Sequence, residues 1–221
     1  MNTKDLLAHV DHTLLTPTVT AQDYIRLCDE GITHGVASIC IPPSRVALCA
    51  KHAAGRVKIC TVAGFPNGYS DTRAKAFEAE TAIIGGATEI DMVIDIGKAK
   101  EHDYQAVLHD IKAIRTATNG HILKVIIETA LLTQEEKIAL CQIVSESGAD
   151  YIKTSTGFAK GGATFEDVAL LRKHTAPEVK VKAAGGITTL EDAYKFISLG
   201  AERLGTSRIV KLAQGLQGEG Y

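Results

Sequence analysis

The sequence contains no tryptophan, and aromatic residues make up only 5% of its 221 residues. A hydrophobic core must therefore be built mainly from aliphatic side chains. No apolar run approaches the roughly 18 residues that a membrane-spanning helix needs. The first residues, Met1–Asp5, lack the apolar centre of a signal peptide. We therefore expect a cytoplasmic protein that does not bind a membrane.

Neither sign of charge is in surplus, because 24 Lys and Arg stand against 26 Asp and Glu. Proteins that bind nucleic acid concentrate positive charge, so we expect no nucleic-acid partner. The five cysteines form no Cys-x-x-Cys pair, which favours free buried thiols in a reducing compartment. The cysteines and histidines do not cluster at the spacing of metal ligands either, so we expect no metal.

The chain alternates short β-branched runs with longer amphipathic runs that are typical of helices. Eight such units of about 28 residues predict a single (β/α)8 TIM barrel over residues 1–221, with a flexible tail at 215–221. The alternative is an open doubly wound sheet, but Gly-x-Gly-x-x-Gly is absent after the first expected strand. Strands are expected at 10–14, 36–41, 57–63, 89–94, 121–128, 151–154, 179–184 and 203–205. Helices are expected at 3–8 (a short N-terminal helix), 21–34, 45–53, 73–84, 104–116, 134–147, 165–174, 190–198 and 207–214.

Among the ionisable residues within expected strands, where most residues are apolar, four stand out: Asp91, Lys124, Lys153 and Lys182. The three lysines are spaced 29 residues apart. We therefore expect them at equivalent places in three neighbouring units. Active-site residues of TIM barrels come from the ends of several strands, so these four are candidate catalytic residues.

Burial and neighbouring positive charge both favour the neutral form of a lysine. A neutral lysine attacks a carbonyl group and forms a Schiff base. Asp91 would hold one ammonium in place and relay protons. Two other interpretations stay open: an ion-pair network that fills the barrel, and lysines exposed at its rim.

Glycine-containing loops follow three of the expected strands. Glycine lets backbone N–H groups approach an anion closely, and TIM barrels often bind phosphate after strands seven and eight. A helix N-terminus adds favourable electrostatics for an anion. Tight turns also need glycine, so these loops are weak evidence alone. These candidate phosphate-binding loops contain Thr156, Gly157, Gly185, Gly186, Gly205 and Ser207.

Several motifs made of these residues resemble the 2-deoxyribose-5-phosphate aldolases, a family of class I (Schiff-base) aldolases. The resemblance extends along nearly the whole chain, and its most specific element is Lys-Thr-Ser-Thr-Gly at 153–157. The other matching stretches are Asp-His-Thr-Leu-Leu at 11–15, Gly-Phe-Pro-Asn-Gly at 64–68, Glu-Ile-Asp-Met-Val at 89–93, Leu-Lys-Val-Ile-Ile-Glu-Thr at 123–129 and Lys-Ala-Ala-Gly-Gly-Ile at 182–187.

The resemblance implies a role for each ionisable residue. Lys153 would be the Schiff-base nucleophile, Lys182 would favour its neutral form and assist proton transfer, and Asp91 would be the acid/base partner. Lys124 would shape the proton relay or contact a substrate hydroxyl. Which cation meets the phosphate stays open, because Phe158 stands where some members have a basic residue.

The reaction implied is reversible cleavage of 2-deoxy-D-ribose 5-phosphate into glyceraldehyde 3-phosphate and acetaldehyde. It needs no cofactor and no metal, because the protein's own imine accepts the electrons. The partners would be small phosphorylated sugars and aldehydes, with a second copy of the chain in a homodimer. Two other functions stay open: another phosphate-handling barrel enzyme, such as an isomerase or a transaldolase-like enzyme, and a sugar-phosphate-binding protein without catalysis.

The C-terminal residue, Tyr221, ends a segment that contains three glycines. A frayed terminus is the simpler interpretation, but the resemblance implies a tyrosine that reaches the site and assists protonation of the enamine. We expect deletion of Tyr221 to slow the exchange of acetaldehyde methyl protons with solvent, as followed by NMR. An unchanged exchange rate would refute this role.

Overall fold

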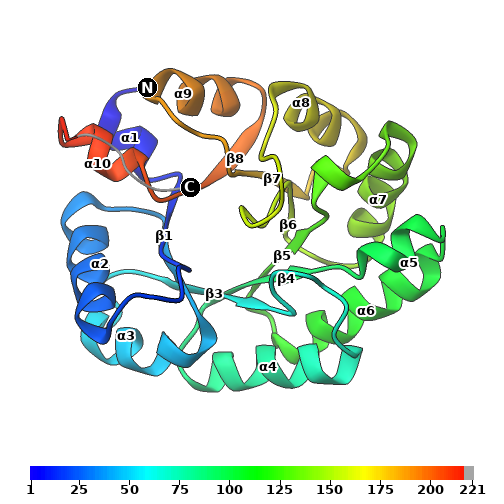
Figure 1. The fold of residues 1–221 in the computed structure, drawn as a ribbon, viewed down its shortest axis with the longest axis horizontal. Coiled ribbons are helices and arrows are strands. Elements are labelled where there is room, and N and C mark those ends of the chain that lie inside the picture. Colours follow the sequence, from blue (N-terminus) through cyan, green and yellow to red (C-terminus); the bar gives the residue numbers. More distant parts are fainter. Residues whose placement is uncertain (217–221) are drawn as a thin grey trace.

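Eight parallel strands follow one another in chain order around a closed barrel, with helices on its outside (Figure 1). This is a computed structural model, and it describes residues 1–216. The (β/α)8 prediction is confirmed, and an open sheet is excluded because the first strand pairs with the eighth. The strands are β1 (Val10–Thr13), β2 (Ser38–Ile41), β3 (Ile59–Ala63), β4 (Glu89–Val93), β5 (Ile122–Ile126), β6 (Tyr151–Lys153), β7 (Lys180–Ala184) and β8 (Ala201–Thr206).

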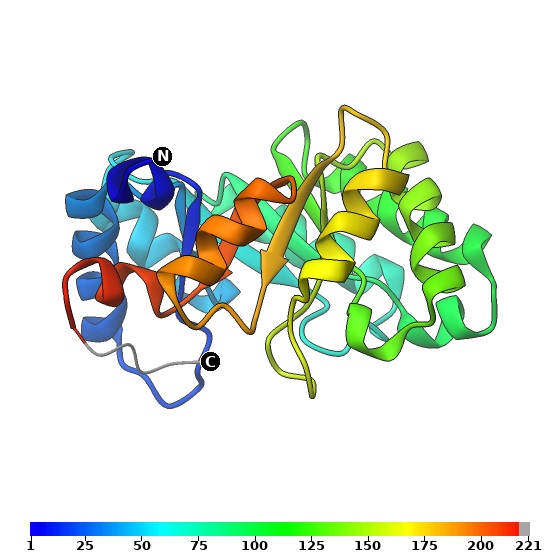
Figure 2. The same cartoon turned by 90° about the horizontal axis from the view of Figure 1, so that it is seen from above.

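The helices have the bounds α1 (Thr3–Leu7), α2 (Ala21–His34), α3 (Val46–Ala53), α4 (Thr72–Ile84), α5 (Ile96–Lys100), α6 (Tyr104–Ala117), α7 (Gln134–Glu146), α8 (Phe165–His174), α9 (Leu190–Ser198) and α10 (Ile209–Ala213). The two terminal helices, α1 and α10, lie side by side, as two views of the ribbon show (Figures 1 and 2). No helix within residues 1–216 combines the length and the apolar character that crossing a membrane requires.

Side-chain caps explain where several of the helices begin. Thr133 and Thr189 each accept a hydrogen bond from the third helical residue, whose own carboxylate accepts one from the cap backbone. Such a capping box satisfies two N–H groups that have no partner within the helix. Asp95 caps α5 in the simpler way, by accepting from the Lys98 N–H. The sequence analysis missed α5, because a five-residue helix is too short to show a helical period.

The main hydrophobic core fills the space between the strands and the surrounding helices. A second, smaller apolar cluster consists of Leu15, Cys40, Cys60 and Val62, with Phe65 packed against it. These residues belong to β2, β3 and the segments that follow β1 and β3. Most of the large buried side chains in both clusters are aliphatic, as expected for a chain without tryptophan and with few aromatic residues.

A buried ion pair joins α4 to α6 and to the end of β4. Lys75 Nζ donates to Asp110 Oδ2 at 2.7 Å and to the Val93 carbonyl at 3.0 Å. The stem of Lys75 also supports the loop after β3, because a Cβ on Gly64 would lie 2.6 Å from Lys75 Cδ. Lys75 therefore holds together two helices and two loops at the C-terminal end of the barrel.

We expect Lys75→Met to destabilise the protein by about 3–5 kcal/mol, because it leaves the Asp110 carboxylate buried without its cation. Urea unfolding followed by circular dichroism measures the loss. The double variant Lys75→Met/Asp110→Leu should recover most of it. Lys98→Met removes a half-exposed ion pair with Glu101 and should cost less than about 1 kcal/mol. Equal losses for Lys75→Met and Lys98→Met would contradict the prediction.

Candidate active site inside the barrel

A cluster of buried ionisable side chains occupies the inside of the barrel. Four are cations and three are carboxylates, which gives the cluster one net positive charge. Its members come from six of the eight strands: Asp11, Glu89, Asp91, Lys124, Lys153, Lys182 and Arg203. The structure thus brings together all four candidate catalytic residues, and the interpretation of the lysines as rim residues is wrong.

Asp91 lies at the centre of three lysines. Its Oδ1 accepts from Lys124 Nζ at 2.7 Å. Its Oδ2 accepts from both Lys153 Nζ at 2.8 Å and Lys182 Nζ at 2.7 Å. One carboxylate therefore fixes the positions of all three amines, and a single oxygen atom connects Lys153 to Lys182.

The other two carboxylates neutralise the cations that Asp91 alone cannot balance. Lys182 Nζ also donates to Asp11 Oδ2 at 2.5 Å, and Lys124 Nζ also pairs with Glu89 Oε2 at 2.7 Å. Arg203 joins the two carboxylates, at 2.5 Å from Asp11 and 2.9 Å from Glu89. Lys153 differs from these, because Asp91 is its one carboxylate contact in the part of the chain that the structure describes.

The sequence analysis did not assign Asp11, Glu89 or Arg203 to the site. A signal for Glu89 was available: it lies two residues before Asp91, and residues two apart on a strand share a face. The same rule relates Arg203 to Gly205 on β8. Asp11 also carried a signal, because it is an ionisable residue of the expected strand 10–14 and opens the Asp-His-Thr-Leu-Leu motif.

The equal spacing of the lysines along the chain does not give them one register in the sheet. Lys153 lies directly opposite Lys182 on the neighbouring strand. Lys124 instead lies opposite Tyr151, two residues before Lys153. The expectation of equivalent places is therefore correct for Lys153 and Lys182 and wrong for Lys124.

The carboxylates keep the buried cations charged. Burial lowers the pKa of Lys182, but the nearby Asp11 and Asp91 outweigh this effect and raise it above its usual range. Burial lowers the pKa of Lys124 as well, and Asp91 with Cys60 and the other carboxylates raises it well above that range. The expectation that burial would make these amines neutral is thus wrong for Lys124 and Lys182.

The same contacts act in the opposite direction on the acids. Burial raises the pKa of Asp91, but the charges of Lys124, Lys153 and Lys182 hold it well below its usual range. Burial likewise raises the pKa of Asp11, and Lys182, Lys124 and Arg203 together lower it below that range. Both carboxyl groups are therefore ionised at neutral pH.

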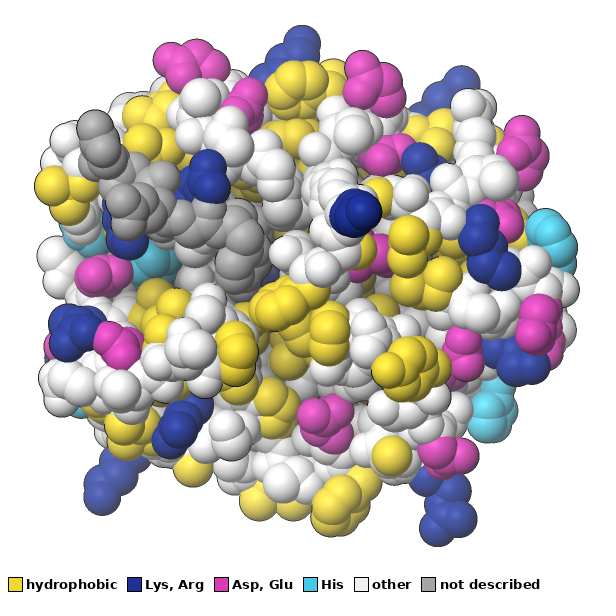
Figure 3. Space-filling model, in the orientation of Figure 1, with side chains coloured by type: hydrophobic (Ala, Val, Ile, Leu, Met, Phe, Trp, Pro, Cys, Tyr) yellow, Lys and Arg dark blue, Asp and Glu magenta, His cyan; other side chains and the backbone are white. Residues whose placement is uncertain are grey.

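Lys153 ends β6 at the C-terminal mouth of the barrel, and 4% of it is exposed, whereas Lys124 and Lys182 are completely buried. Close to this mouth, the rings of Phe65 and Phe158 meet edge to face, with their centroids 5.2 Å apart. Hydrophobic side chains gather near the centre of the face in Figure 3, and most charged side chains stand at its edge. An amine with some exposed surface, close to apolar side chains, suits a small carbonyl compound.

Glycines bring the loops after β6, β7 and β8 close together. A Cβ on Gly162 would lie 2.5 Å from the backbone carbon of Gly185, and one on Gly185 would lie 3.7 Å from Gly157 Cα. Gly157, Gly185 and Gly186 all have positive φ angles, of 85°, 73° and 72°. A side chain at Gly162 would push the loops apart, and the positive φ angles of the other three favour glycine.

Gly205 differs from the loop glycines because it lies against side chains inside the barrel. A Cβ there would lie 3.0 Å from Lys182 Cε and 2.9 Å from the Cβ of Ala184. Gly205 therefore leaves room for the stem of Lys182 inside the barrel. Its position next to Gly185, whose N–H donates to the Gly205 carbonyl at 3.4 Å, also places it beside the glycine loops.

Glu128 is a further residue that the sequence analysis did not assign to the site. Its Oε2 accepts from both the backbone N–H of Thr156 at 3.0 Å and Thr156 Oγ1 at 2.5 Å. Its Oε1 is buried without a hydrogen-bond partner within residues 1–216. Glu128 also has a φ angle of 55°, a conformation that costs roughly 1–3 kcal/mol and occurs often at functional sites. Thr156 therefore already gives both of its donors to a carboxylate.

Ser207 follows β8 and lines a cavity of about 400 Å³ together with His12, Arg26 and Lys211. The cavity lies against α2 and next to the end of β1. His12 Nε2 pairs with Glu30 at 2.7 Å. Tyr221, the accessory residue expected from the sequence, lies outside the described residues, and so does most of the expected tail.

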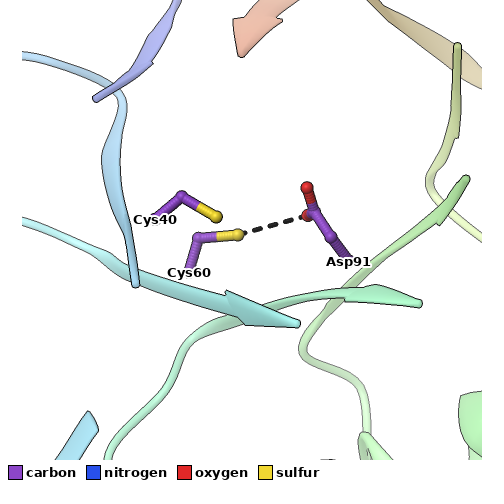
Figure 4. Close-up of side chains that lie close together, drawn as sticks. All are labelled: Cys40, Cys60 and Asp91. Atoms are coloured by element: carbon purple, nitrogen blue, oxygen red, sulfur yellow. Dashed lines mark hydrogen bonds between the residues drawn. The ribbon is translucent and has the colours of Figure 1, made fainter. Parts of the chain in front are cut away.

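Two groups of side chains inside the barrel offer ligand atoms that could hold a metal ion. One is Cys40, Cys60 and Asp91, which Figure 4 shows together. The other is Asp11, Cys60 and Glu89. The sequence analysis expected no metal from spacing along the chain, which does not show residues that meet across strands.

The family model of the DeoC/LacD family aldolases matches residues 6–216. The chain belongs to this family of aldolases. Two relatives named deoxyribose-phosphate aldolase are similar to this aldolase: one from Clostridium botulinum, 52% identical over all of both chains, and one from Streptococcus agalactiae, 54% identical over 97% of this chain and 96% of the relative.

A solved structure, that of the tetrameric deoxyribose phosphate aldolase from Aeropyrum pernix, shares the fold of this aldolase. The two chains are 32% identical, and their structures superpose with a TM-score of 0.90. The match covers 97% of this chain and 92% of that one. The likeness therefore extends over the whole barrel.

The stability of this aldolase should depend on pH through Asp11 and Asp91. Both carboxyl groups have a lower pKa when folded than the usual 3.9 or so of an unfolded chain. Their contribution is therefore present above about pH 4 and is lost as the pH falls through the folded-state values. We expect a smaller decrease of the unfolding free energy between about pH 4 and pH 2 for Asp11→Asn than for the wild type, in urea titrations. Equal slopes would contradict this assignment.

Proposed function

We propose that this aldolase cleaves 2-deoxy-D-ribose 5-phosphate reversibly into glyceraldehyde 3-phosphate and acetaldehyde through a Schiff base on Lys153. The observation that carries the proposal is the contact of one Asp91 oxygen with both Lys153 and Lys182 at the open end of the barrel. The names of the similar proteins support the substrate.

Lys153 is the amine best placed to react. Lys182 is held between two carboxylates, and Lys124 is held by Asp91 and Glu89. Lys153 has a single carboxylate partner, and it shares that partner's oxygen with Lys182. It is also the lysine that the substrate can reach.

The reaction begins when Lys153 Nζ, after losing one proton, attacks the aldehyde carbon of the sugar. The resulting carbinolamine loses water and becomes an iminium ion. The bond between the second and third carbons then breaks, its electrons move into the iminium, and the proton of the 3-hydroxyl leaves. Glyceraldehyde 3-phosphate departs, and the enamine gains a proton at carbon and is hydrolysed to acetaldehyde.

Lys182 and Asp91 serve the proton transfers of this sequence. Their shared contact lets a proton pass from Lys182 toward the reacting centre along a path of under 3 Å per step. Asp91 takes up this proton only transiently, and in its ionised form it stabilises the iminium charge on Lys153. Lys124 donates to the other oxygen of Asp91 and so holds this carboxylate in place. We therefore assign Lys124 to the proton relay and not to contact with a substrate hydroxyl.

The phosphate would bind at the glycine loops. Gly157, Gly185 and Gly186 offer a backbone path for close approach of an anion, and Gly205 and Ser207 follow on the neighbouring strand. Thr156 would contribute through the loop that Glu128 holds. Lys160 and Arg208 are cations that follow these loops within three residues in the sequence.

The proposal also covers the location, the cofactors and the oligomeric state of the enzyme. We place it in the cytoplasm as a single barrel domain without a metal or organic cofactor for its reaction. We propose a homodimer. The accessory role of Tyr221 in protonating the enamine stays a prediction.

Reduction with borohydride in the presence of the sugar phosphate tests the proposal. We expect a stable adduct on Lys153, identified by peptide mass spectrometry, because reduction fixes the imine. Lys153→Ala should lose both the adduct and turnover while keeping the wild-type circular dichroism spectrum. Lys137→Ala, which alters an ion pair outside the barrel, should keep both.

The same experiment separates the alternatives. Substrate binding without any adduct would favour a sugar-phosphate-binding protein. An adduct without release of acetaldehyde would favour a different Schiff-base enzyme. Substantial turnover by Lys153→Ala would refute the role of Lys153.

A further inference from the structure

Two thiols lie beside the central carboxylate of the barrel. Cys40 and Cys60 are direct partners on the neighbouring strands β2 and β3. Figure 4 shows both side chains directed toward Asp91, and Cys60 Sγ donates to Asp91 Oδ1 at 3.2 Å. The two sulfur atoms and a carboxylate oxygen all lie within 4.8 Å of one another. None of the three residues has more than 1% of its surface exposed.

This arrangement matches the ligand set of a soft divalent ion. Zinc takes thiolate sulfur at about 2.3 Å and carboxylate oxygen at about 2.0–2.2 Å in a tetrahedral site. Those bond lengths separate the ligand atoms by about 3.6–3.8 Å. Cys60 Sγ and Asp91 Oδ1 are 3.2 Å apart, and all three ligand atoms lie within 4.8 Å of one another. Small side-chain rotations therefore bring these three atoms to the spacing of a tetrahedral site.

We propose that Cys40, Cys60 and Asp91 form a binding site for a thiophilic divalent ion, Zn²⁺ or Cd²⁺, and that the bound ion inhibits the aldolase. The ion has no part in the reaction and competes with it. The inhibition rests on the proposed function, whereas the binding does not.

The charge balance inside the barrel permits this binding. The two thiols lose their protons to solvent as two metal–sulfur bonds form, so one divalent ion replaces two protons. The net charge of the buried cluster therefore does not change. Lys124 Nζ, 3.3 Å from Cys60 Sγ, stabilises the thiolate that forms.

Inhibition follows because a metal bound to Asp91 takes this carboxylate out of the proton path. A metal bound to Oδ1 replaces Lys124 there, and Lys124 keeps its other partner, Glu89, at 2.7 Å. The carboxylate that Lys153 and Lys182 share is then bound to a divalent cation. The proton path between those two amines is disturbed, so turnover should fall.

The chain also offers a matched control pair of thiols. Cys28 on α2 and Cys49 on α3 are both completely buried and in contact with each other. Within residues 1–216, neither belongs to a group of three potential metal ligands. They test whether two adjacent buried thiols alone bind the ion.

The experiment is a titration of the reduced full-length protein with Cd²⁺, followed by the ultraviolet sulfur-to-metal charge-transfer band. We expect one ion per chain in the wild type and in Cys28→Ser/Cys49→Ser. Cys40→Ser should lose the band while keeping a cooperative thermal transition. A band that persists in Cys40→Ser, or that disappears in the double variant, would overturn the site.

Turnover of the sugar phosphate is measured at each point of the same titration. We expect activity to fall as the band saturates and to return when EDTA removes the ion. A saturated band with full activity would overturn the inhibitory effect but not the binding site. Absence of turnover before any Cd²⁺ is added would instead count against the proposed function.

Discussion

The carboxylate of Asp91 accepts hydrogen bonds from three lysines, and the arrangement of the barrel interior depends on these contacts. Three ammonium groups around one carboxylate repel one another, and burial removes the water that would screen them. Asp11 and Glu89 supply the remaining negative charge, and Arg203 ties those two carboxylates together. The network therefore satisfies every lysine fully except Lys153, the one that faces the opening.

The ion-pair interpretation and the catalytic interpretation of these residues thus describe two parts of one structure. Lys124 and Lys182 are paired in the way that a buried structural network requires, and their pKa values are raised accordingly. This network also holds the reactive amine of Lys153 at hydrogen-bond distance from Asp91. Such pre-organisation is what a site needs when catalysis depends on charge that develops during the reaction.

The surrounding fold supports this interior by close backbone contacts. Gly205 makes room for Lys182, and Gly162 lets the loop after β6 rest against Gly185. Glu128 fixes Thr156 on the adjoining loop. The loops at the mouth therefore pack directly against one another. The smaller apolar cluster, which contains Cys40 and Cys60, lies on β2 and β3.

The sequence by itself determined the barrel, because eight alternations of strand and helix patterns leave little else for a chain of this length. It also singled out Asp91, Lys124, Lys153 and Lys182, since charge is rare in otherwise apolar strands. The tertiary structure alone decided which carboxylates neutralise the lysines, and that Lys124 has a different register from Lys153 and Lys182. A strand's period shows which residues share a face. It does not show how far neighbouring strands are shifted, or which side chains meet across the barrel, because both depend on closure of the whole sheet.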